Sequence, residues 1–189
     1  MVAYEARLAT LTAILAQRAD RPVRLEYTRA EEFVAGRTRH ASVTTLRVGV
    51  KKSGDITAIE ARTTMDTGAY VASGAGVLRR AGQGALYLYH CPNTRYEAHL
   101  AYTNRPAAGS YRGLGAPQGH FALEVHMDRV AEALGMDPLE FRLQNAAREG
   151  TVRVDGPVYP RVGGVEVLEA VKASDHWNSP LEGPNRGRG

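Results

Sequence analysis

Two stretches of alternating hydrophobic residues, separated by a short polar turn, constrain the fold of this chain more than any other feature. Residues 42–51 and 59–65 each place hydrophobic or small side chains at every second position. Between them, Lys52-Ser53-Gly54-Asp55 contains residue types that tolerate a positive φ. This pattern predicts a long antiparallel β-hairpin with one half-buried face. The alternating residues are Leu46, Val48, Val50, Ile59, Ala61, Thr63 and Met65.

Shorter patterns before the hairpin predict three more elements. Hydrophobic residues at helical spacing indicate an amphipathic helix over residues 4–17. Residues 23–27 are a candidate for a short strand. Thr28 and Glu31 stand three apart, as in a capping box, and predict a brief helix that runs through Val34.

One strand and three helices are predicted after the hairpin. Residues 94–103 are expected to form the strand, and the first of the helices ends at Gly135. The second helix begins after Asp137 and runs to about Arg148, and the third covers residues 164–173. The tail from residue 178 shows no periodicity. These elements predict an α+β fold, in which an antiparallel β-hairpin sheet, extended by one or two strands, has flanking helices.

The composition excludes several classes of protein. The chain has 189 residues, of which 43% are hydrophobic, enough for one domain or two small ones. Its 24 basic residues are interspersed with 20 acidic ones, so a nucleic-acid or other polyanion partner is disfavoured. Cys91 is the single cysteine, which excludes an internal disulfide or an iron–sulfur cluster and fits a reducing cytoplasm. No secretory signal or apolar run of about 20 residues is present.

Glycine is concentrated in residues 66–84 and 104–119, for which no regular element is predicted. The segment from Gly109 to Gln118 is the most informative, because its glycine turn leads directly into a helix. At such a helix N-terminus, main-chain N–H groups favour negative charge, and an oxyanion or an oxo-metal group could bind there. A tight loop shaped only for packing remains the alternative.

The sequence of this segment resembles the Ala-Phe-Arg-Gly-Phe-Gly-x-Pro-Gln signature of the molybdenum hydroxylases, the xanthine dehydrogenase and aldehyde oxidase family. Further pieces match in order along nearly the whole chain. The matching pieces are Arg21-Pro22-Val23-Arg24, the Thr-Arg-x-Glu-Glu turn from Thr28, Asp66-x-Gly68-Ala69-Tyr70, and the two helices within residues 124–143. The resemblance implies that residues 1–175 are part of the first molybdopterin-binding domain of a large subunit, with 176–189 as a linker toward a second.

The resemblance also implies roles for single residues. The main-chain amide of Arg112 is expected at the oxo and sulfido ligands of the molybdenum. Leu114 stands where the family has an aromatic residue that stacks on purines, so such stacking is expected to be reduced. Arg80 aligns with an arginine that orients the substrate. The residues expected to bind the cofactor are Tyr111, Arg112, Gly113 and Gly115, those expected to bind substrate are Arg80 and Leu114, and no side chain is expected to bind the metal.

Two parts of the family pattern fall outside these 189 residues. The glycine-rich turn that precedes the family's first helix is missing, because Met1 stands at about its last position. The family's general base, a glutamate, lies beyond Gly189, so no catalytic residue is assigned here. Carbon monoxide dehydrogenases have a copper-binding cysteine at the position of Gly113, which excludes a copper site. The chain is therefore expected to be a fragment that is inactive by itself.

The resemblance implies a molybdenum–molybdopterin cofactor and the oxidation of an aldehyde or an N-heterocycle with water as the oxygen source. Electrons would pass to [2Fe–2S] clusters and FAD on partner subunits or fused domains, in a cytoplasmic oligomer. The substrate and the pterin dinucleotide form are left open. The alternative from another class is a stand-alone, non-catalytic binding or scaffold module derived from the same fold.

Overall fold

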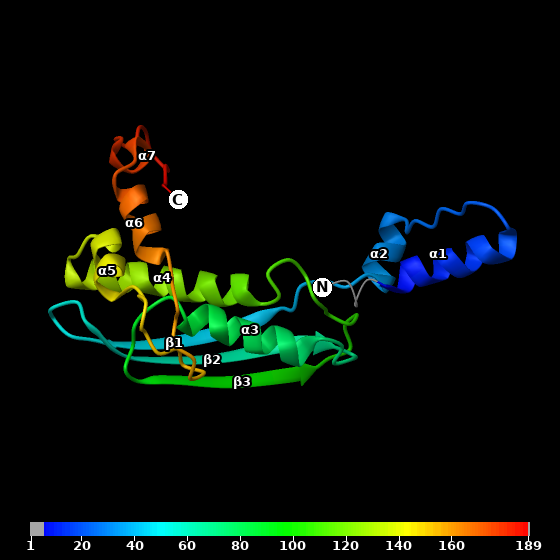
Figure 1. Ribbon diagram of the computed structural model, residues 1–189, viewed down its shortest axis with the longest axis horizontal. Helices are drawn as coiled ribbons and strands as arrows, with labels where there is room; N and C mark the ends of the chain where they lie inside the picture. The colour runs from blue at the N-terminus through cyan, green and yellow to red at the C-terminus, as the bar shows by residue number, and fades with distance from the viewer. Residues whose placement is uncertain (1–5, 189) are drawn as a thin grey trace.

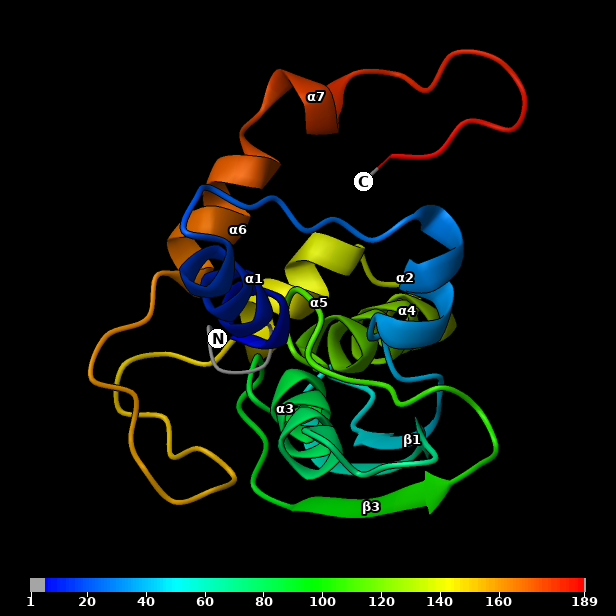
Figure 2. The ribbon, with the colours of Figure 1, turned by 90° about the vertical axis from the view of Figure 1, so that its right-hand side faces the viewer.

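In the computed structural model, which describes residues 6–188, a three-stranded sheet carries two helices on one face (Figure 1). The strands are β1 (Ser42–Val50), β2 (Ile56–Gly68) and β3 (Thr94–Tyr102), in that order across the sheet. The helices are α3 (Gly74–Leu86), which covers β2 and β3, and α4 (Ala116–Leu134), which lies over β1 (Figure 2). The predicted α+β fold is confirmed.

The predicted hairpin is present and supplies much of the core. β1 and β2 pair antiparallel, with Leu46 opposite Ala61 and Val48 opposite Ile59. The alternating side chains of β2 are buried beneath the helices. The opposite face of the sheet is polar, and there Glu97 forms ion pairs with Arg62 at 3.4 Å and Arg95 at 3.7 Å. The largest fully buried side chains include Ile59, Met65, Leu123, Met127 and Phe141.

The third strand is parallel to its neighbour, because α3 crosses over between β2 and β3. No helix was predicted for residues 66–84, and α3 is the main element missed. Its glycines permit close packing, which a pattern search does not detect. A Cβ on Gly82 would lie 2.4 Å from the Tyr96 ring, and one on Gly84 would lie 2.7 Å from the carbonyl oxygen of Ala116.

Helix α5 (Pro138–Asn145) begins as predicted and ends earlier than predicted. The Asp137 side chain accepts hydrogen bonds from the Leu139 and Glu140 amides at 2.8 and 3.0 Å. The helix stops before Ala146, whose backbone is extended and forms a β-bridge with Tyr89. Asn145 is buried and ties α5 to the hairpin, since its side chain bonds the Ile56 amide and the Gly54 carbonyl oxygen, each at 2.9 Å.

Helices α1 (Ala6–Ala19) and α2 (Arg29–Ala35) form an arm that projects away from the sheet (Figure 1). Both predicted helices are confirmed where the structure describes them, although residues 4 and 5 lie outside the described residues. The capping box of Thr28 and Glu31 is also confirmed. The strand predicted over residues 23–27 is wrong, since that segment is irregular and pairs with no strand among the described residues.

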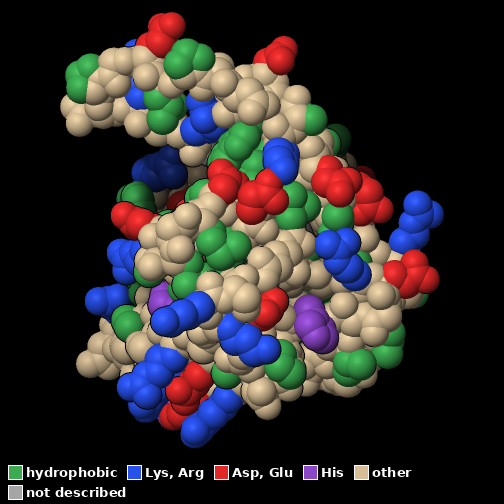
Figure 3. All heavy atoms as spheres, turned by 90° about the vertical axis from the view of Figure 1, so that its left-hand side faces the viewer, with side chains coloured by type: hydrophobic (Ala, Val, Ile, Leu, Met, Phe, Trp, Pro, Cys, Tyr) green, Lys and Arg blue, Asp and Glu red, His purple; other side chains and the backbone are tan. Residues whose placement is uncertain are grey.

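Helices α6 (Gly164–Lys172) and α7 (Asp175–Asn178) follow α5 and rise above the sheet layer. The first was predicted. The second is a single turn that Ser174 caps by accepting a hydrogen bond from the Trp177 amide. Figure 3 shows this end of the molecule, where acidic and basic side chains are interspersed with hydrophobic ones. The proposed boundary between residues 175 and 176 stays a prediction.

Candidate functional site

The segment from Gly109 to Gln118, here called the signature loop, forms two overlapping turns before α4. The Leu114 amide donates to the Tyr111 carbonyl oxygen at 2.8 Å, and the Ala116 amide donates to the Gly113 carbonyl oxygen at 2.9 Å. Gly113, Leu114 and Gly115 have φ values of 83°, 51° and 96°. The first turn is therefore of type II and the second resembles type I′. Two of these three positions are glycine, the residue that adopts a left-handed backbone without strain.

Helix α3 holds the loop in place by close backbone contact. A Cβ on Gly115 would lie 2.2 Å from the Val77 carbonyl oxygen, and one on Gly119 would lie 2.1 Å from that of Ala81. At the start of the loop, the hydroxyl of Ser110 donates to the hydroxyl of Ser73 at 3.0 Å. Helix α3, which the sequence did not predict, thus supports the signature loop.

Several main-chain donors of the loop, including those of Ser110 and Tyr111, are left open within residues 6–188. Within residues 6–188, the amides of Arg112, Gly113 and Gly115 have no hydrogen-bond acceptor, and they lie at or just before the N-terminus of the 19-residue helix α4. The Tyr111 carbonyl oxygen points into its turn, so the Arg112 N–H of the same planar trans peptide points away from it. Open amides at a helix N-terminus favour an anionic or oxo group.

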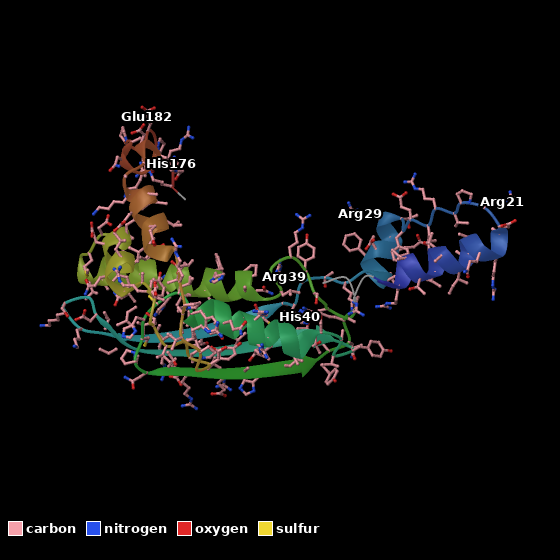
Figure 4. All side chains as sticks on the ribbon, in the orientation of Figure 1. Arg21, Arg29, Arg39, His40, His176 and Glu182 are labelled. Atoms are coloured by element: carbon pink, nitrogen blue, oxygen red, sulfur yellow. The ribbon has the colours of Figure 1, made fainter. Side chains whose placement is uncertain are left out.

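Arg39 contacts the loop at three points, although nothing in the sequence singled it out. Its guanidinium donates to the Arg112 carbonyl oxygen at 2.6 Å and to Oε1 of Gln118 at 3.1 Å. It also lies over the Tyr111 ring, 4.8 Å from the centroid. Figure 4 shows Arg39 beside His40 on the segment that leads into β1. These contacts join residues more than 70 positions apart in sequence, so no local pattern could have found them.

The other predicted site residues are only partly brought together. Tyr111, Arg112 and Gly113 are exposed in one loop, and the Leu114 side chain is half-buried beside them. Arg80 lies on the exposed side of α3, the helix that packs against the loop, and donates to Oε1 of Gln83 at 2.8 Å. No contact joins Arg80 to the loop in the structure, so its role as a substrate residue stays a prediction.

His40 is buried beneath the loop, with 2% of its surface exposed. Burial lowers the pKa of its imidazole, an effect that the Asp66 carboxylate and the Gly109 backbone oppose only in part. Asp66 accepts hydrogen bonds from Thr103 at 2.7 Å and from the Gly68 amide at 2.8 Å, and these bonds lower the pKa of its carboxyl. These contacts give Asp66 a structural role at the end of β2.

The comparisons with known proteins identify the family. The profile of the molybdopterin cofactor-binding domain matches residues 3–146. The chain therefore belongs to this family, and the resemblance found in its sequence is confirmed.

Its relatives are molybdenum enzymes of much greater length. The chain is 43% identical to the xanthine dehydrogenase molybdenum-binding subunit of Escherichia coli O157:H7 over 157 residues, which are 82% of this chain and 21% of that one. It is 36% identical to the aldehyde oxidoreductase of Megalodesulfovibrio gigas, covering 77% of this chain and 16% of that protein. The structure of the aldehyde oxidoreductase from Desulfovibrio gigas matches with a TM-score of 0.74 and 31% identity, over 86% of this chain and 18% of that one. The chain thus spans about a fifth of the length of these relatives.

None of the helices in residues 6–188 is both long and apolar enough to cross a membrane.

Proposed function

We propose that this chain is part of the molybdopterin-binding subunit of a molybdenum hydroxylase, and that its signature loop contacts the metal end of the cofactor. The observation that carries the proposal is the run of three left-handed residues, Gly113 to Gly115, which leaves neighbouring amides open at the N-terminus of α4. The family match and the relatives' names support the same reading.

The residues present fit such a group. Oxo and sulfido ligands accept hydrogen bonds, and the open amides of the loop can donate them. Neither Arg39 nor Arg112 has a carboxylate within ion-pair distance among residues 6–188, so both charges remain available to attract an anionic cofactor. The proposal needs no metal ligand from a side chain, and the described residues contain no cluster of three or more His, Cys, Asp or Glu that could hold a metal ion.

Each residue of the loop has a defined part in the proposal. The Arg112 amide donates to the cofactor, while Gly113 and Gly115 permit the backbone to turn there. Tyr111 supports the loop through the stacked Arg39 side chain. Leu114 borders the substrate position, and Arg80 orients the substrate through its guanidinium. When bound, the cofactor supplies two-electron oxidation with water as the source of oxygen.

We further propose that the parent enzyme oxidises an aldehyde or an N-heterocycle. Its electrons would pass to [2Fe–2S] clusters and FAD on partner subunits or fused domains. The general base, an oligomeric assembly and a cytoplasmic location likewise stay predictions.

Two substitutions at one position test whether the Arg112 amide binds the cofactor. Arg112→Ala removes the side chain and keeps the N–H. Arg112→Pro removes both, yet proline is favoured at the second position of a type II turn, and this N–H makes no bond within residues 6–188. In the complete parent protein, we expect molybdenum per polypeptide to stay near normal in Arg112→Ala and to fall severalfold in Arg112→Pro. Full molybdenum content in Arg112→Pro would contradict the proposed contact between this amide and the cofactor.

A further inference from the structure

Arg39 lies on a segment that runs alongside both ends of the signature loop. Thr38 forms a parallel bridge with Ala108 and accepts a hydrogen bond from the Gly109 amide at 3.0 Å. On the other side, the His40 carbonyl oxygen accepts from Nε2 of Gln118 at 3.2 Å. The backbone on either side of Arg39 is therefore fixed relative to the loop, which gives its side chain a defined starting point.

The contacts of Arg39 flank the three left-handed residues. One nitrogen bonds the Arg112 carbonyl oxygen and another bonds Gln118, while the guanidinium plane lies over Tyr111. A planar group with several donors can make all three contacts together, whereas an ammonium group cannot stack and bond in the same way. Arg39 has no carboxylate partner within residues 6–188, and its guanidinium donates its hydrogen bonds to the loop.

Arg39 contacts the peptide between Arg112 and Gly113, whose orientation is the least restricted by steric contacts. Arg112 and Gly113 are the central residues of the first turn, and the peptide between them can rotate by about 180° to convert a type II turn into type I. Glycine allows both orientations because it has no Cβ. The hydrogen bond from Arg39 to the Arg112 carbonyl oxygen, at 2.6 Å, exists in only one of them. Because the peptide is planar and trans, that bond also sets the direction of the Gly113 N–H.

We infer that Arg39 is a positioning residue that locks the Arg112–Gly113 peptide in the type II orientation, so that the open Gly113 amide faces away from Arg39. The inference deepens the proposed function, since a fixed amide direction matters only if the loop binds a ligand. The lock itself is a property of the free chain. Charge-assisted hydrogen bonds are stronger than neutral ones, so one such bond suffices to favour one turn type over the other.

The lock can be tested by NMR on the 189-residue chain without cofactor. In Arg39→Ala, we expect the Arg112 carbonyl-carbon and Gly113 amide-nitrogen resonances to move or double, because this peptide then adopts both turn types. Arg39→Lys keeps the charge but not the planar fork, so it should restore these signals only in part. Arg95→Ala, which removes an exposed arginine of the sheet face, is the matched control and should leave them unchanged.

Unchanged Arg112 and Gly113 resonances in Arg39→Ala, with the hairpin resonances intact, would overturn the inference. If Arg39→Ala does not fold, full restoration of the wild-type signals by Arg39→Lys would overturn it equally, because charge alone would then account for the effect. Failure of the proposed function would be seen separately, as full molybdenum content in Arg112→Pro, and would leave the NMR result intact.

Discussion

Single residues act in the signature loop mainly through their backbone. Arg112 offers an amide, and Gly113 and Gly115 offer conformations that other residues adopt only with strain. Leu114 has a φ of 51° without being glycine, a conformation that costs on the order of 1–2 kcal/mol. Unfavourable backbone conformations of this kind persist where the surrounding structure holds them, often at functional sites.

Arg80 provides a residue-scale prediction for the parent enzyme. Replacing Arg80 by Ala should lower kcat/KM by ~10²-fold, about the loss of one charge-assisted hydrogen bond of ~1.5–3 kcal/mol. Molybdenum content should stay normal, because Arg80 makes no contact with the loop. Arg79→Ala, at the neighbouring exposed position of α3, is the control. Equal kinetics for the two variants would show that Arg80 is not a substrate residue.

His40 should make the stability of the chain depend on pH. The pKa of this buried imidazole is lowered in the folded state, so the unfolded chain binds the proton more readily. Stability is therefore lost as the pH falls below the ordinary histidine pKa of about 6.5, and the loss levels off below the folded pKa. In His40→Gln, the free energy of unfolding between pH 7 and 5 should fall less steeply, by at most about 1.4 kcal/mol per pH unit. Urea unfolding across this range checks it, and identical slopes would refute it.

At the scale of elements, the contact between α3 and α4 carries the loop. Gly119→Ala places a Cβ about 2.1 Å from the Ala81 carbonyl oxygen, so the helices must separate. We expect a loss of ~1–3 kcal/mol in unfolding free energy, measured from the denaturant midpoint. Gly76→Ala is the matched control on α3, because a Cβ there meets nothing within 4 Å, and it should stabilise the helix by about 0.5–1 kcal/mol. A similar effect of both changes would contradict the role assigned to this contact.

The same elements show what the sequence could predict. Alternation in residues 42–65 defines the hairpin because each side chain faces either the helices or solvent. The glycines of α3 concealed that helix, since they serve contacts with Tyr96 and α4 that lie outside the local pattern. The segment 23–27 has strand-like composition, but a strand needs a neighbour to pair with. The signature loop was found from its motif, whereas Arg39 acts across contacts that only the folded chain creates.

On the scale of the whole molecule, the arm formed by α1 and α2 has exposed hydrophobic side chains. Leu11, Phe33 and Val34 are 50%, 66% and 79% exposed, and no residue of α2 is buried. Large contiguous hydrophobic surfaces often mark interaction sites. The relatives that this chain matches are about five times longer, which agrees with a molecule that contributes one piece of a larger cofactor site.

The claim that these residues supply only part of the cofactor site is tested most directly by the metal content of the isolated 189-residue chain. After expression in a host that makes the molybdenum cofactor, the purified chain should hold far less than one molybdenum per polypeptide and should oxidise neither aldehydes nor N-heterocycles. The open amides of one loop offer too few contacts to retain the cofactor alone. The parent protein serves as the positive control. One molybdenum per isolated chain would contradict the claim that these residues supply only part of the site.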